Sequence, residues 1–73
     1  MKIYKIARQK HSYESYSGHV IVANNEAEVV ALAQEISAFE GGEVWLTATI
    51  EQCGDYTGTE IKPFILLSDY IAG

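Results

Sequence analysis

The apolar positions of residues 25–41 recur with the period of an α-helix. Asn25 is a favoured N-cap residue, and Glu28, three positions later, completes a capping-box pattern. Gly41 and Gly42 are suited to end a helix. We therefore predict one helix from near Asn25 to near Gly41. Its buried stripe would consist of Val29, Leu32, Ala33, Ile36 and Phe39.

Four other segments have the pattern of β-strands. Residues 1–8 are rich in β-favouring side chains, and residues 19–23 are apolar on both faces, as in a central strand. Residues 61–71 form the last candidate strand, and Pro63 favours its start or an edge position. Between residues 44 and 51, alternate side chains should face the helix, and the intervening ones, including the only tryptophan, the opposite side. The helix-facing set is Val44, Leu46, Ala48 and Ile50.

This order of elements predicts a single α+β domain over residues 1–73. Four strands and one helix, in the order ββαββ, would form a two-layer structure with the helix on one face of a four-stranded sheet. Neither face of the first strand is wholly apolar, so we expect its lysine stems to run along an edge of the sheet or over an aromatic side chain. Segments 9–17 and 52–60 are predicted to be loops. One helix covers one sheet face only, so we expect function on the other face.

Charge is unevenly distributed along the chain. The net charge is −5, yet residues 1–13 carry four basic residues and no acid, whereas residues 14–73 carry ten acids and one lysine. This pattern predicts a dipole with a basic N-terminal end. Binding to duplex nucleic acid is not expected, because the acidic part would repel phosphates. A protein with a basic surface would be attracted instead.

The sequence contains no pattern typical of an enzyme. His11 and His19 have neither metal-ligand spacing nor a nucleophile arrangement with Cys53, so we predict no catalytic residue, metal or cofactor. A single cysteine allows no internal disulfide, which fits a reducing cytoplasm, and we expect Cys53 to be a small buried side chain. No apolar run approaches the length of a membrane helix and no signal peptide is recognisable, so we expect a cytoplasmic protein.

Three groups of residues are candidates for contact with a partner. Tyr13 and Tyr16 lie near basic residues in a loop of the kind enriched at interfaces, and we expect one to pack on the sheet and the other to remain in solvent. Trp45 would be either a packed cross-strand partner or the anchor of a dimer or partner contact. The full set is Arg8, Lys10, Tyr13, Tyr16, Trp45, Glu40, Glu43, Glu51 and Asp55.

Several short motifs resemble a group of small hypothetical proteins encoded by phages and prophages. The similarity lies in Tyr13-Glu14-x-Tyr16, the valine-rich segment 20–23, Glu26-Ala27, Trp45 and the apolar ending 65–73. The resemblance implies a phage accessory protein acting in a bacterial cytoplasm. Small acidic phage proteins of this kind often inhibit host defence, as anti-CRISPR proteins do, by covering a nucleic-acid-binding surface.

The sequence therefore favours a protein that acts by binding. The main hypothesis is an anti-defence inhibitor, itself a homodimer, that covers a basic surface of a host defence protein. The first alternative is sequestration of a small nucleotide signal by Arg8, Lys10, Tyr13 and Tyr16. The second is a small structural or assembly protein of the phage particle.

Overall fold

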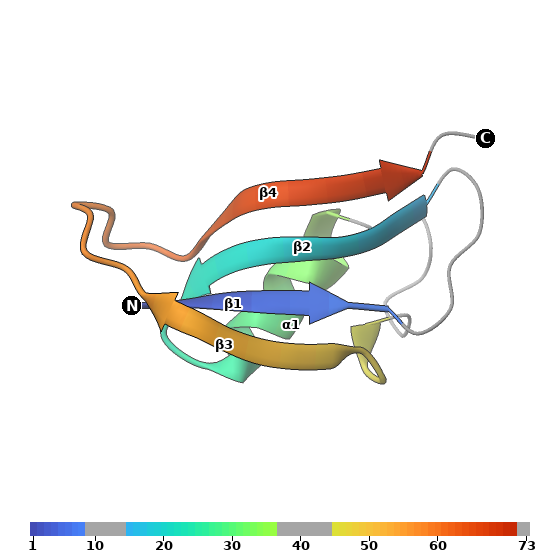
Figure 1. Ribbon diagram of the computed structural model, residues 1–73, viewed down its shortest axis with the longest axis horizontal. Helices are drawn as coiled ribbons and strands as arrows, with labels where there is room; N and C mark the ends of the chain where they lie inside the picture. Colours follow the sequence, from blue (N-terminus) through green and yellow to red (C-terminus); the bar gives the residue numbers. More distant parts are fainter. Residues whose placement is uncertain (9–14, 37–44, 72–73) are drawn as a thin grey trace.

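A computed structural model describes residues 1–8, 15–36 and 45–71. The elements are β1 (Lys2–Ala7), β2 (Ser15–Ala23), α1 (Glu26–Ile36), β3 (Thr49–Asp55) and β4 (Phe64–Ile71). The strands form one sheet in the order β3-β1-β2-β4, in which every neighbouring pair is antiparallel. Figure 1 shows α1 packed on one face of this sheet. The predicted two-layer α+β fold is confirmed.

The two N-terminal strands form the centre of the sheet. β1 lies between β3 and β2, so its lysine stems do not lie along an edge strand, and the central position predicted for residues 19–23 is confirmed. β2 also begins earlier than expected, because Ser15–Gly18 pair with the end of β4 instead of forming a loop. Gly18 permits close contact with β1, since a Cβ atom there would lie 2.8 Å from the carbonyl oxygen of Ile6.

Helix α1 begins as its capping residues predict. The Asn25 side-chain oxygen accepts a hydrogen bond from the Glu28 backbone N–H at 3.0 Å. The Glu28 carboxylate in turn accepts one from the backbone N–H of Asn24, one residue before the cap, at 2.7 Å. These bonds satisfy donors that a helix N-terminus leaves without partners. The described part of the helix ends at Ile36, and the predicted end near Gly41 lies outside the described residues.

The core lies between α1 and the covered face of the sheet. Of the predicted core residues, Val29 and Ala33 are fully buried, and Leu32 and Ile50 pack against the cluster while remaining partly exposed. Ile36 and Leu46 are exposed, so their assignment to the core was wrong. Phe39 and Val44 lie outside the described residues. The buried cluster consists of Tyr4, Ile6, Ile21, Ala23, Val29, Ala33 and Trp45.

The third strand is displaced from its predicted position. Trp45 is fully buried in the core cluster on the helix side, not on the opposite face. The chain turns directly after it, with the Ala48 N–H bonded to the Trp45 carbonyl at 3.3 Å. β3 therefore starts only at Thr49. Burial of the largest side chain outweighs the local alternation and turns Leu46 towards solvent.

The two edge strands, β3 and β4, differ from the sequence predictions at two points and agree with them at one. Residues 52–55 belong to β3 rather than to a loop. Cys53 is exposed, not buried, because the register passes over it between Gln52 and Gly54, making it the extra residue of a bulge on an edge strand. Pro63 directly precedes β4, an edge strand, as predicted.

Candidate functional site

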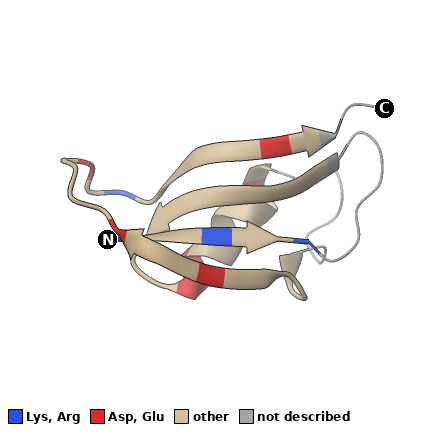
Figure 2. Ribbon diagram, viewed as in Figure 1, with Lys and Arg blue, Asp and Glu red and all other residues tan. Residues whose placement is uncertain are grey.

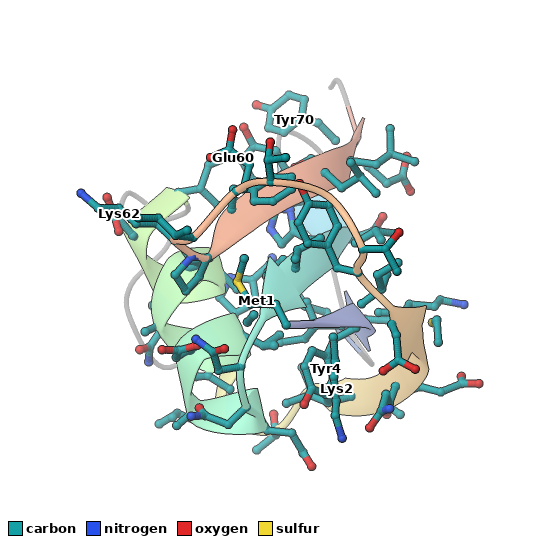
Figure 3. All side chains as sticks on the ribbon, turned by 90° about the vertical axis from the view of Figure 1, so that its left-hand side faces the viewer. Met1, Lys2, Tyr4, Glu60, Lys62 and Tyr70 are labelled. Carbon is teal, nitrogen blue, oxygen red and sulfur yellow. The ribbon has the colours of Figure 1, made fainter. Side chains whose placement is uncertain are left out.

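Strand alternation leaves one set of side chains on the sheet face opposite α1. Because Tyr4 and Ile6 belong to the core cluster, their neighbours Ile3, Lys5 and Ala7 point away from the helix. Among the described residues no helix covers this side, which we call the open face; Figure 3 looks along the strands and shows α1 on one side of the sheet only. The register arranges the open face in three rows across the strands. They are Gly54–Ile3–Val22–Phe64, Glu51–Lys5–Val20–Leu67 and Thr49–Ala7–Gly18–Asp69.

Aromatic side chains close one end of the open face. The rings of Tyr56 and Phe64 meet edge to face with centroids 5.4 Å apart. Val22, in the same row as Phe64, is fully buried although it is not part of the helix-side cluster. The Tyr56 backbone N–H donates to the Met1 carbonyl at 3.0 Å, which ties the end of β3 to the start of β1. This end of the face is packed within the domain.

The other end of the open face is hollowed. The row there has its two smallest side chains, Ala7 and Gly18, side by side at the centre of the sheet. A pocket of about 200 Å³ lies over them. Its walls include Lys5, Val20, Leu67 and Asp69. We call this pocket the hollow.

One acidic side chain, Asp69, lines the hollow, and a second, Glu51, lies beyond Lys5 on the far side. Glu51 on β3 stands directly opposite Lys5, and Asp69 on β4 stands next to Gly18. Figure 2 shows this arrangement as a basic residue on β1 between acidic residues on β3 and β4. The Ser17 hydroxyl donates a hydrogen bond to the Asp69 carboxylate and thereby orients it. Lys5 also lines the hollow, but the two carboxylates outnumber it, so the sum of these three exposed charges favours a cationic group.

A second cluster lies at the same end of the sheet, on the helix side. His19 is buried, and its ring centroid lies 5.0 Å from that of Tyr16 and 4.9 Å from that of Trp45. Tyr16 also meets Tyr70 edge to face at 4.9 Å. The Arg8 guanidinium lies 5.6 Å from the Trp45 ring centroid and donates to the Tyr16 carbonyl at 3.1 Å. The fold thus joins three predicted contact residues in one helix-side cluster, in which Trp45 is buried and Arg8 and Tyr16 are partly buried.

The helix-side cluster contains a hydroxyl–imidazole pair that the sequence analysis missed. The Nδ1 atom of His19 lies 2.7 Å from the Oγ atom of Ser68. Such a pair can activate a nucleophile where substrate reaches it. Here the imidazole is enclosed by Tyr16 and Trp45, so we assign the pair a packing role. No spacing could have revealed it, because 49 positions separate the two residues and only the β2–β4 register joins them.

The remaining predicted contact residues have different positions. Glu51 is exposed on the open face, and Asp55 is exposed at the end of β3 opposite Lys2. Tyr16 is half-buried against the core. Four of the predicted contact residues lie outside the described residues: Lys10, Tyr13, Glu40 and Glu43. The division of roles expected for Tyr13 and Tyr16 therefore stays a prediction. Within the described part of the chain, no group of three potential metal ligands occurs.

Comparisons with known proteins identify no relative of this chain. The chain matches no family model, no curated protein and no solved structure. In the described ranges, no helix has both the length and the apolar character needed to cross a membrane.

Proposed function

We propose that this protein acts by binding, without catalysis, a partner protein with a basic surface, and that the open face makes the contact. The observation that carries the proposal is the hollow in a sheet face that no described helix covers, with Glu51 and Asp69 on either side. An apolar depression surrounded by polar side chains is the usual anatomy of a protein contact. Inhibition of a bacterial defence protein is the form of this function that the resemblance to phage proteins implies.

The nucleotide alternative loses support from the positions of Arg8 and Tyr16. Stacking on a base requires an accessible ring and an available cation. The Arg8 guanidinium is already placed over Trp45 and bonded to the Tyr16 carbonyl, and the Tyr16 ring contacts His19 and Tyr70. These side chains serve the interior of the domain. We therefore do not carry this alternative forward.

The proposal is tested with a partner isolated from nuclease-treated bacterial lysate and then purified. The double variant Glu51→Gln/Asp69→Asn removes two charges from the open face and keeps the side-chain shapes. Exposed charge pairs contribute about 0.2–1 kcal/mol each, so affinity should fall roughly twofold to thirtyfold. Added salt should weaken wild-type binding in the same way.

The matched control removes the same charge from the opposite side of the molecule. Glu26→Gln/Glu35→Gln neutralises two exposed helix residues and should leave the affinity unchanged. Equal losses in the two double variants would show a nonspecific charge effect and contradict the proposal. Affinity that is independent of salt would contradict it as well.

A further inference from the structure

The hollow follows from two small residues side by side, one of which the backbone requires. Gly18 is needed where β2 approaches β1, because a Cβ atom would contact the Ile6 carbonyl oxygen at 2.8 Å. Ala7 lies directly opposite it. The next row carries Lys5, Val20 and Leu67, whose longer side chains rise around this low point. The depression is therefore a fixed part of the sheet.

The volume of the hollow indicates whether it would hold one side chain or a whole small-molecule ligand. Pockets for small molecules and cofactors are usually about 300–1,000 Å³. The hollow, at about 200 Å³, is smaller. Protein interfaces concentrate their binding energy in one or a few large side chains inserted into pockets of this kind. The volume fits one such anchor.

The charged side chains at the rim of the hollow indicate which group would lie next to the inserted side chain. Asp69 is exposed, and the Ser17 hydroxyl holds its carboxylate at the side of the hollow. Lys5, on the other side, has Glu51 directly opposite as a cross-strand neighbour. A cation entering beside the anchor therefore meets Asp69. Arginine and lysine side chains are the cations that a protein partner can offer there.

We propose that the hollow over Ala7 and Gly18 is an anchor pocket that takes one large apolar side chain of the partner protein, with an adjacent lysine or arginine on Asp69. This inference rests on the proposed function and makes it specific. The partner's contact segment would then contain an aromatic or long aliphatic residue next to a basic one. A partner surface with basic side chains alone would leave the hollow unfilled.

Tryptamine, which joins an indole ring to an ammonium group, is the probe for this chemistry. In a ¹⁵N NMR titration it should shift the amides of Ala7, Gly18, Val20 and Leu67 and reach saturation. Indole-3-propionate has the same ring with the opposite charge, and ethylamine has the charge without the ring. Indole-3-propionate should bind roughly twofold to thirtyfold more weakly than tryptamine, because its charge is repelled where the ammonium group is attracted. Ethylamine should bind at least about tenfold more weakly, because it lacks the ring.

Two matched pairs of variants locate the binding. Ala7→Leu fills the hollow and should reduce tryptamine affinity at least about tenfold, whereas Ala27→Leu adds the same atoms to an exposed helix position and should leave it unchanged. Leu67→Asn removes apolar surface from the wall of the hollow without adding a charge or burying a new group, since Leu67 is 66% exposed, and should weaken tryptamine binding. Its control is Leu46→Asn, at a loop position that is 64% exposed, which should leave the affinity unchanged. The second pair decides the matter if Ala7→Leu does not fold.

Several results would overturn the anchor pocket. They are shifts confined to another surface, equal binding of indole-3-propionate, or unchanged affinity in both Ala7→Leu and Leu67→Asn. Shifts of the same amides on raising protein concentration without tryptamine would identify a second copy of the chain as the occupant. Because the probe needs no partner, a failed anchor pocket remains distinguishable from a failed proposed function. Loss of partner binding on neutralising Glu51 and Asp69, without tryptamine binding, would retain the function and reject the anchor.

Discussion

Trp45 is the largest fully buried side chain among the described residues. It is fully buried and belongs to the same cluster as Val29 and Ala33 of α1. Its ring meets that of His19, while the Arg8 guanidinium lies over it. β2, α1 and the segment that leads into β3 are therefore held together by one side chain.

Replacement of Trp45 by alanine should cost about 3–5 kcal/mol, since a large buried ring is lost and a cavity remains. A core of this size supplies only about 3–5 kcal/mol in total, so the variant should be largely unfolded. Circular dichroism during urea denaturation measures the effect without needing the lost indole fluorescence. The control Leu46→Ala, at the exposed neighbouring position, should stay within about 0.5 kcal/mol of wild type. Comparable losses for the two variants would contradict this role of Trp45.

At the residue scale, the sequence predicted local features and missed those set by distant contacts. The Asn25 cap and the burial of Val29 follow from neighbours in the chain, and both are present. Leu46 and Cys53 were assigned to the interior from local pattern alone. Their exposure results from the burial of Trp45 and from a bulge against β1. Neither cause is visible within a few residues of the site.

At the scale of elements, the two edge strands differ in how they are protected. β3 carries the exposed acids Glu51 and Asp55 and a bulge, which oppose pairing with another strand. β4 has a bulge too, but Leu66, Leu67 and Tyr70 are exposed along it. An apolar edge strand is a template for pairing with another chain. The expected homodimer remains a prediction, and β4 is the edge that favours it.

Antiparallel pairing of β4 with β4 of a second copy should therefore give a symmetric dimer. Leu66→Lys places a charge on the edge and should shift the equilibrium to monomer, as measured by sedimentation equilibrium over a wide concentration range. Leu66 is 57% exposed, so the change should not unfold the domain. Leu46→Lys, at a similarly exposed loop position, should leave the dimer intact. A wild-type protein that stays monomeric throughout would reject this use of β4.

At the scale of the whole molecule, strand order decides what the charge pattern means. The basic N-terminal segment was expected to form one end of a dipole. Instead β1 lies inside the sheet, with Lys5 opposite Glu51 and Lys2 opposite Asp55. Charges that are separate in the sequence are adjacent in space, as Figure 2 shows. Local patterns give the elements but not their neighbours. Lys10 lies outside the described residues, so the dipole as a whole stays a prediction.

The same limit applies to the candidate site. The two-layer fold, and with it an open face opposite the helix, followed from the count and order of elements. The hollow did not, because it requires Ala7 to stand opposite Gly18 and Asp69 to arrive from the other end of the chain. Long-range register therefore had to be known before the site could be seen.

The strand order also bears on how the chain folds. β1, β2 and α1 lie within residues 2–36, whereas both edges come from residues 49–71. The central hairpin and its helix are local contacts, which form early, and each edge must close a longer loop. During synthesis, the central hairpin leaves the ribosome before β3 and β4 can pair with its two outer edges.

Native-state hydrogen exchange should then show β3 and β4 opening at lower free energy than β1 and β2. Equal protection in all four strands would mean that the sheet forms as one unit. In the sequential case, mispairing is most probable before β3 and β4 have been made, and their arrival closes the sheet on both sides.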